Sequence, residues 1–389
     1  MMEGHRRRAR GLPAAVAAVA VSVTGCTSPV AFYRPGEGAP DGPVAALSGP
    51  APYVRARTEP PVPVATARTD VYAATRAGML RPAVRAMPHR LYVPNARTRR
   101  VDVIDQRTLR VVGSLPGGPG PVVAGWDLRR LWSGGAVPIS PRTGRVGRAA
   151  PGAGADAKRG PVYFDPSGRA ALVPAGRWLG VHDPGTLRRR GSVRLPCTAR
   201  HADFSADGTF LLVSCTGAGR VVRVDPARQE VTGALTLPPG ARPGDLRLAP
   251  DGAVFYVTDA ARGGVWLVDG LGLRTAGFVA TGPGARDPVV SRDARRLFVL
   301  GDTGVTTIDF ATRRATGHWP LSRGDTVPGG VSADGALLWV ASPEGGAVYA
   351  LSTRTGRTLH RVRVGGRPQA PLVYPQPGHH SLGGPGLYR

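Results

Sequence analysis

Five segments of the 389-residue chain place an arginine at similar intervals. They are Lys158-Arg159, Arg200-His201, Arg242, Arg286-Asp287 and Arg367. The first four arginines are 41, 42 and 44 residues apart, and the last follows after 81 residues, about twice that interval. Two carboxylates, Asp203 and Asp245, lie three residues after Arg200 and Arg242. Guanidinium groups bind carboxylates and phosphates through paired hydrogen bonds, so these residues form a candidate site for a small anionic ligand. A chance distribution of a very frequent residue is the alternative.

Two cysteines in the body of the chain, Cys197 and Cys215, have His201 between them. In an exported protein such a pair favours a disulfide. A Cys/His/Cys metal site and two buried thiols are the alternatives. The chain has no His-x-x-x-His pair, no Gly-x-Ser-x-Gly turn and no P-loop, so we assign no catalytic residue, metal site or cofactor. His379-His380 lies in a Gly-rich tail, where we expect a solvated turn.

The first 25 residues predict a lipoprotein signal peptide. Four arginines between residues 6 and 10 precede an apolar stretch, residues 11–23, that is too short to span a bilayer. The following Val23-Thr-Gly-Cys26 resembles the lipobox of bacterial lipoproteins. We therefore expect Cys26 to carry lipid and to hold the protein on the outer face of the cell membrane. Ordinary signal cleavage, with Cys26 incidental, is the alternative.

Residues 26–69 predict a flexible tether. They are rich in Pro, Ala and Gly and show no apolar period, so they cannot bury enough surface to offset the entropy of ordering. The apolar density rises from Asp70 onward. We expect residues 70–389 to form the folded domain, with its first segment docked on the body.

The charge is strongly positive, with 51 Lys and Arg against 26 Asp and Glu and a net charge of +25. Lys158 is the only lysine, so nearly all the excess is arginine. The chain lacks the basic stripe with interleaved aromatic residues that nucleic-acid sites need, and we expect no nucleic-acid partner. Attraction to anionic lipid headgroups or cell-wall polymers fits the charge better.

A strand pattern recurs seven times and must position these residues. Short apolar strands are centred on residues 92, 132, 172, 212, 256, 298 and 339. Periods of this length are typical of solenoids, propellers and arrays. A second apolar segment follows each, and in five repeats it ends in an aspartate that can begin an Asx-type turn. These are Asp105, Asp183, Asp225, Asp269 and Asp309.

The repeats predict an all-β, seven-bladed propeller of four-stranded blades. Asp-Gly pairs such as Asp207-Gly208 supply the hairpin turn before the first apolar strand. With the strand ahead of that turn and one strand after the second, each repeat contains four strands. The first repeat lacks its innermost strand, whereas a spare one, Ala370–Tyr374, follows the seventh. We expect this C-terminal strand to complete the first blade and close the ring.

The strand sequences also resemble a known family. Leu91-Tyr-Val-Pro-Asn95, Val101-Asp-Val-Ile-Asp105 and Val111-Val-Gly113 resemble the YVTN-repeat β-propellers. Phe204-Ser-Ala-Asp-Gly208 and Val331-Ser-Ala-Asp-Gly335 look like the actinobacterial lipoprotein branch of that family. The resemblance implies the propeller fold. Its function stays open, because related propellers hold haem d1, copper centres or lactonase sites and others have no assigned activity.

The sequence as a whole predicts a membrane-anchored, extracytoplasmic binding or scaffold module. We expect a monomer that uses the funnel face for a small anionic molecule or a cell-envelope protein. The alternative is an enzyme or cofactor carrier, lactonase-like or handling haem or metal, with His201, Asp203, Asp245 and the arginines at its site. We expect a binding protein rather than an enzyme.

Overall fold

The computed structural model describes residues 70–117, 120–134, 136–151, 160–321, 326–384 and 386–389. The predicted signal peptide, lipidated Cys26 and tether lie outside the described residues, as does Arg159. All described residues belong to one compact unit of the chain. None of the helices in this part of the chain is long and apolar enough to span a membrane.

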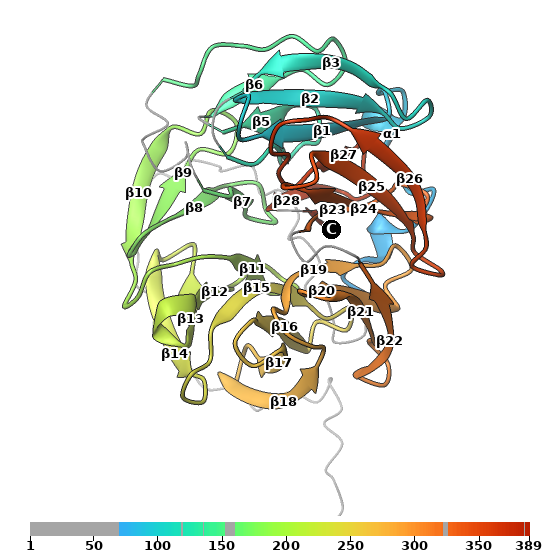
Figure 1. Ribbon diagram of the computed structural model, residues 1–389. Helices are drawn as coiled ribbons and strands as arrows, with labels where there is room; N and C mark the ends of the chain where they lie inside the picture. Colours follow the sequence, from blue (N-terminus) through green and yellow to red (C-terminus); the bar gives the residue numbers. More distant parts are fainter. Residues whose placement is uncertain (1–69, 118–119, 135, 152–159, 322–325, 385) are drawn as a thin grey trace, which may run out of the picture. The chain divides into compact units, whose positions relative to one another are not determined.

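The strands form seven antiparallel sheets arranged as a ring, which confirms the predicted propeller (Figure 1). Five blades have four strands each. From the centre of the ring outward, blade 1 contains β27 (Leu372–Tyr374), β1 (Arg90–Asn95), β2 (Arg100–Asp105) and β3 (Val111–Pro116). In the same order, blade 4 contains β11 (Ala202–Phe204), β12 (Leu211–Cys215), β13 (Arg220–Asp225) and β14 (Glu230–Thr236). Blade 5 contains β15 (Pro243–Leu248), β16 (Val254–Asp259), β17 (Gly264–Asp269) and β18 (Arg274–Ala280). Blade 6 contains β19 (Arg286–Val290), β20 (Arg296–Leu300), β21 (Gly304–Asp309) and β22 (Arg314–Pro320). Blade 7 contains β23 (Val327–Val331), β24 (Leu337–Ser342), β25 (Ala347–Ser352) and β26 (Thr358–Arg363).

Blades 2 and 3 depart from this plan. Blade 2 has three short strands, β4 (Val123–Ala124), β5 (Leu131–Ser133) and β6 (Val137–Ile139). In place of a fourth strand, one bridge joins Ile139 to Val146. Blade 3 contains β7 (Tyr163–Phe164), β8 (Ala171–Ala175), β9 (Trp178–His182) and β10 (Arg189–Arg194). It is extended at its inner edge by β28 (Ser381–Gly383) and β29 (Leu387–Tyr388). The helical segments are η1 (Ala73–Thr75), α1 (Pro82–Arg85) and η3 (Thr216–Ala218).

The ring closes as the sequence predicts, because β27 pairs with β1 as the innermost strand of blade 1. The seam between the first and last blades is apolar. Leu91 and Val93 of blade 1 pack in one buried cluster with Trp339 and Ala341 of blade 7. Burial on both faces explains why the middle strands of the repeats are so strongly apolar.

The aspartate that ends the third strand of most blades begins the same turn each time. In blade 1, Asp105 Oδ1 accepts hydrogen bonds from the amides of Arg107 and Thr108, each 2.8 Å long. The fifth residue of the turn then takes the left-handed conformation, with φ between 46° and 73°. It does so at Leu109, Gly144, Leu187, Gln229, Leu273, Arg313 and Gly356. The repeat is therefore encoded locally, by turn chemistry as well as by apolar strands.

Both ends of the described chain dock on the ring. The hydroxyl of Tyr72 donates to the carbonyl of Leu248 in blade 5, 2.8 Å away. At the other end the chain passes from blade 1 to blade 3, where Gly383 of β28 pairs with Tyr163 of β7. Figure 1 shows the last residue near the middle of the ring.

The tail matches its expected solvated turn at His379, which is exposed, but not at His380. The ring of His380 is half-buried and stacks on Trp126, with centroids 5.7 Å apart. Burial, helped by nearby positive groups, lowers the pKa of His380 to about 4. The Gly-rich sequence suggested solvent exposure, but its turns instead bring Leu382 and Leu387 into the blade 3 core.

Candidate functional site

The predicted arginines lie where each blade's innermost strand begins. Arg200 lies two residues before β11, Arg242 immediately precedes β15, and Arg286 opens β19. Arg367 lies a few residues ahead of β27. Because the innermost strands of a propeller run alike around the axis, these four residues share one face of the ring.

Two of the four arginines on this face already have acidic partners. Arg286 Nη1 lies 2.7 Å from Asp302 Oδ1, and Arg367 Nη2 lies 2.7 Å from Glu344 Oε1. Arg200 and Arg242 are exposed. Exposed ion pairs contribute little to stability, so these pairs mainly reduce the positive charge that the face presents to a ligand.

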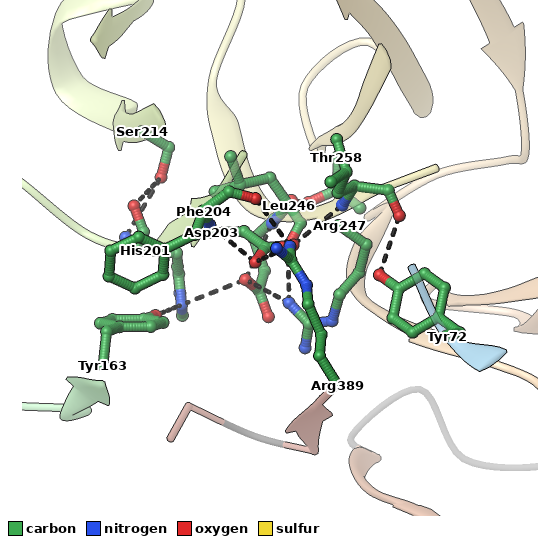
Figure 2. A network of polar contacts seen from close by, with 12 residues as sticks. Tyr72, Tyr163, His201, Asp203, Phe204, Ser214, Leu246, Arg247, Thr258 and Arg389 are labelled. Carbon is green, nitrogen blue, oxygen red and sulfur yellow. Dashed lines mark hydrogen bonds and ion pairs between the residues drawn. The ribbon is translucent and has the colours of Figure 1, made fainter. Parts of the chain in front are cut away.

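Asp203 is fully buried and held by a guanidinium that the sequence did not indicate (Figure 2). Arg389 Nη2 lies 2.9 Å from Asp203 Oδ1. The same guanidinium donates to the backbone carbonyls of Ser205, at 2.7 Å, and Phe204, at 2.6 Å. The amide of Leu248 donates to Asp203 Oδ2 at 2.9 Å. Each oxygen of this carboxylate therefore has a partner inside the protein.

Asp245, one blade further on, is paired in the same way. Arg247 Nη1 lies 2.9 Å from Asp245 Oδ1, and both side chains are almost completely buried. Asp245 Oδ2 is buried and has no hydrogen-bond partner among the described residues. His201 Nδ1 lies 3.6 Å from Asp245 Oδ1 and 3.3 Å from the hydroxyl of Tyr163. Tyr163, His201, Asp245 and Arg247 thus form one network. Figure 2 shows Tyr163, His201 and Arg247 around the Asp203–Arg389 pair.

Asp287 lies at the edge of this network with an unusual backbone. Its φ is 45°, and the pairing of β19 with β20 shifts register between Arg286 and Pro288. Such a bulge redirects a side chain relative to its strand. Burial raises the pKa of the Asp287 carboxyl, and the charge of Asp245 raises it further. The Asp287 side chain keeps 26% of its surface exposed and His201 keeps 24%, so solvent reaches the network at these two residues.

Three residues of the network and the adjacent pair, Tyr163, Arg247 and Arg389, were missed by sequence reasoning. Arg247 had a signal, because it stands between Leu246 and Leu248 in an inner strand where an apolar residue is expected. Strand alternation turns the two leucines into the blade 5 core and Arg247 away from it. Arg389 had none, because its partner Asp203 is 186 residues away in the sequence.

Cys197 and Cys215 are joined by a disulfide, with an S–S distance of 2.02 Å. Both residues are buried in the core between blades 3 and 4. His201 turns to Tyr163 and Asp245 instead. Within the described ranges, no group of three or more His, Cys, Asp or Glu side chains could hold a metal ion.

Comparisons with known proteins identify the fold. No family model matches the chain, and no curated protein matches it. Kuenenia stuttgartiensis hydrazine synthase aligns with a TM-score of 0.54 at 17% identity, over 68% of this chain and 91% of its own. The dihydro-heme d1 dehydrogenase NirN in complex with DHE aligns with a TM-score of 0.53 at 14% identity, over 81% and 83%. The β-propeller domain of Myceliophteria thermophila Cps50 (Swd1) aligns with a TM-score of 0.55 at 14% identity, over 66% and 90%.

These similarities support the seven-bladed propeller and nothing finer. At identities of 14–17% they show the fold alone, and the matched proteins have different roles. Membership of the YVTN-repeat family stays a prediction from the strand sequences.

Proposed function

We propose that this protein is a membrane-anchored, extracytoplasmic propeller of the YVTN-repeat type that acts as a binding or scaffold module. Its ligand is an anionic molecule or a cell-envelope partner. Support for the address comes from the sequence, where a charged and apolar leader ends at Cys26. The long Pro-, Ala- and Gly-rich segment that follows would hold the propeller away from the membrane surface.

One structural observation carries the choice of binding over catalysis. The two carboxylates nearest the axis, Asp203 and Asp245, are each neutralised by a buried arginine of the same chain. A catalytic carboxylate must reach a substrate, whereas these two hold the inner strands and the tail together. Their charges therefore serve the fold.

The anchor is tested by expressing the full chain with Cys26→Ser and separating membranes from soluble material. Loss of the lipid attachment site should move the protein from the membrane fraction to the soluble one. The neighbouring Ser28→Ala variant is the matched control and should stay with the membranes. Continued sedimentation of the Cys26→Ser protein with the membranes would refute the anchor.

The binding role is tested by native mass spectrometry of the full chain purified from the envelope of its own organism. A bound anionic compound, or a stable complex with an envelope protein, is expected. A chain that carries neither, together with the mobility of a free monomer in detergent extracts of the envelope, would contradict it.

One observation favours the alternative of an enzyme or cofactor carrier. Asp287 has a raised pKa, reaches solvent and shares a network with His201 and Asp245, as acid–base groups in active sites often do. A chromophore or a bound metal in the purified protein would favour this alternative. A colourless, metal-free protein that retains its partner would favour the binding module.

A further inference from the structure

We propose that the groove between blades 2 and 3 is a binding site for a multivalent oxyanion, with phosphate groups as its recognised feature. The groove is a cavity of about 750 Å³, with a second cavity of about 280 Å³ beside it that shares Arg130, Trp132 and Gly185. Binding pockets for small molecules fall in this size range. The inference deepens the proposed binding function and rests on it.

The groove exists because blade 2 is incomplete. Its sheet ends at the three-residue strand β6, whereas every other blade continues with an outer strand of six or seven residues. Residues 145–150 follow the outer edge of β6 without forming a regular strand, through backbone hydrogen bonds to Pro138 and Ala136. Arg148 and Ala150 of this segment line the groove together with the turn between β9 and β10 of blade 3. Arg130 of blade 2 joins that turn through a 2.8 Å hydrogen bond from Nη1 to the carbonyl of Gly185.

The lining of the groove is strongly and unevenly charged. Five arginines line it, and one acidic residue, Asp183, stands with them. The arginines are Arg130, Arg148, Arg188, Arg189 and Arg190. In the adjoining cavity, by contrast, one arginine, Arg130, is balanced by one aspartate, Asp127. A ligand that carries several negative charges would offset the mutual repulsion of these guanidiniums.

The one carboxylate of the groove is already engaged. Asp183 forms an ion pair with Arg190, and its Oδ1 accepts hydrogen bonds from Gly185 and Thr186. Burial acts to raise the pKa of Asp183, but the Thr186 hydrogen bonds and the Arg190 charge prevail and lower it. Asp183 therefore stays ionised and fixes Arg190, and Arg130, Arg148 and Arg188 add further positive charge to the lining.

Two of the arginines are available to a ligand. Arg148 and Arg188 are exposed, and no described residue forms an ion pair with either of them. Arg130 lies over the ring of Trp132, 5.4 Å from its centroid, which holds its guanidinium at the wall of the groove. Phosphate oxygens can accept paired hydrogen bonds from several such groups at once.

The turn that carries these arginines is held in place before any ligand binds. Leu187, next to Arg188, is fully buried and packs against Trp132 and Val173 in the core between the two blades. Its backbone is left-handed, with φ of 55°, and the next residue, Arg188, is exposed. A site on an anchored turn loses less conformational entropy on binding than one on a mobile loop.

The test is isothermal titration calorimetry of the full chain, solubilised in a neutral detergent, with pyrophosphate as the probe at low salt. We expect one site, with affinity that falls as salt rises. Arg148→Gln/Arg188→Gln should weaken binding at least 100-fold, because each lost charge-assisted contact costs about tenfold or more. The matched control is Arg314→Gln/Arg357→Gln, which changes exposed arginines that follow the corresponding turns of blades 6 and 7.

The outcomes separate the site from the proposed function. If Arg314→Gln/Arg357→Gln weakened pyrophosphate binding as much as the groove variant does, the binding would be a diffuse attraction to a basic surface, and the proposed site would be overturned. Absence of pyrophosphate binding would overturn it too, whereas the proposed function is judged separately by fractionation and by mass spectrometry of the native protein.

Vesicles of about 30% phosphatidylglycerol in phosphatidylcholine distinguish the source of the phosphate. Binding of both probes, lost in the groove variant, indicates a lipid headgroup, and binding of pyrophosphate alone indicates a soluble ligand.

Discussion

Arg389 should be one of the most important single side chains for the stability of the ring. Its guanidinium pairs with fully buried Asp203 and donates to the carbonyls of Phe204 and Ser205, with 7% of its own side chain exposed. Arg389→Met keeps the length of the side chain but removes the cation and its donors. The Asp203 carboxylate would then keep two backbone donors, from Phe204 and Leu248. Its remaining nearby cation, Arg247, already pairs with Asp245.

The size of the effect follows from the burial. Removing one partner of a buried ion pair costs about 3–5 kcal/mol, because the remaining charge is left uncompensated. For a domain of this size that corresponds to a fall in Tm of roughly 5–8 °C. Differential scanning calorimetry at a fixed scan rate measures it. Arg354→Met, which changes an exposed arginine in blade 7, is the matched control and should shift Tm by less than about 1 °C.

The pH dependence identifies the cause. Burial already raises the pKa of Asp203 in the folded protein, and the Arg389 charge opposes that shift. Without Arg389 the folded pKa rises further above the unfolded value. The penalty is then fully present above the folded pKa and declines as the pH falls through it toward the unfolded value.

The loss near neutral pH should therefore shrink as the pH approaches the ordinary carboxyl range, about 4, and Asp203→Asn should recover part of it in the double variant. A Tm for Arg389→Met equal to that of the control, or a loss independent of pH, would refute the assigned ion pair.

Three further changes probe the rest of the ring. Leu187→Ala should destabilise the protein by about 2–5 kcal/mol in chemical denaturation. Leu187→Gly should cost about 1 kcal/mol less, because glycine adopts the left-handed backbone of this position more easily than alanine. A larger loss of stability for Leu187→Gly than for Leu187→Ala would contradict this. Deletion of residues 368–389 removes β27 and β28 and should abolish the cooperative melt, so an unchanged melt would count against ring closure. The folded pKa of His380, about 4, is below its unfolded value. The free energy of unfolding should therefore fall by roughly 2–3 kcal/mol as the pH drops from about 6.5 to 4. His380→Gln should remove this dependence on pH. An NMR titration that places the pKa of His380 near its ordinary value of about 6.5 would disprove the prediction.

The fold could be predicted from the sequence because its information is local. The apolar strands, the Asp-Gly hairpins and the Asx turns at residues such as Asp105 and Asp225 are each defined within a few residues. Their repetition at a fixed period then leaves little choice of architecture. The closing strand β27 was predictable for the same reason, since the first repeat lacks a strand and the last is followed by one.

The environment of the candidate site could be predicted only in part. Repeat spacing was enough to expect Asp203, Asp245 and the arginines near one face. It did not reveal that Asp203 meets Arg389, because that contact depends on the path of the tail across the ring. The same path accounts for His380, whose Gly-rich surroundings resemble a solvated turn in sequence but lie against Trp126 in the structure.

The two arginine-rich regions of the protein differ in how their charge is balanced. At the axis, Arg247 and Arg389 each face one buried aspartate, so that removing either partner leaves an uncompensated charge shielded from solvent. In the groove, five arginines face one aspartate and much of their surface is exposed. Substitutions at the axis should therefore change stability, with a dependence on pH. Substitutions such as Arg188→Gln should leave the melt almost unchanged and alter affinity for anions and its dependence on salt. Measuring both quantities on both sets of variants separates the charges that hold the ring together from those that serve a ligand.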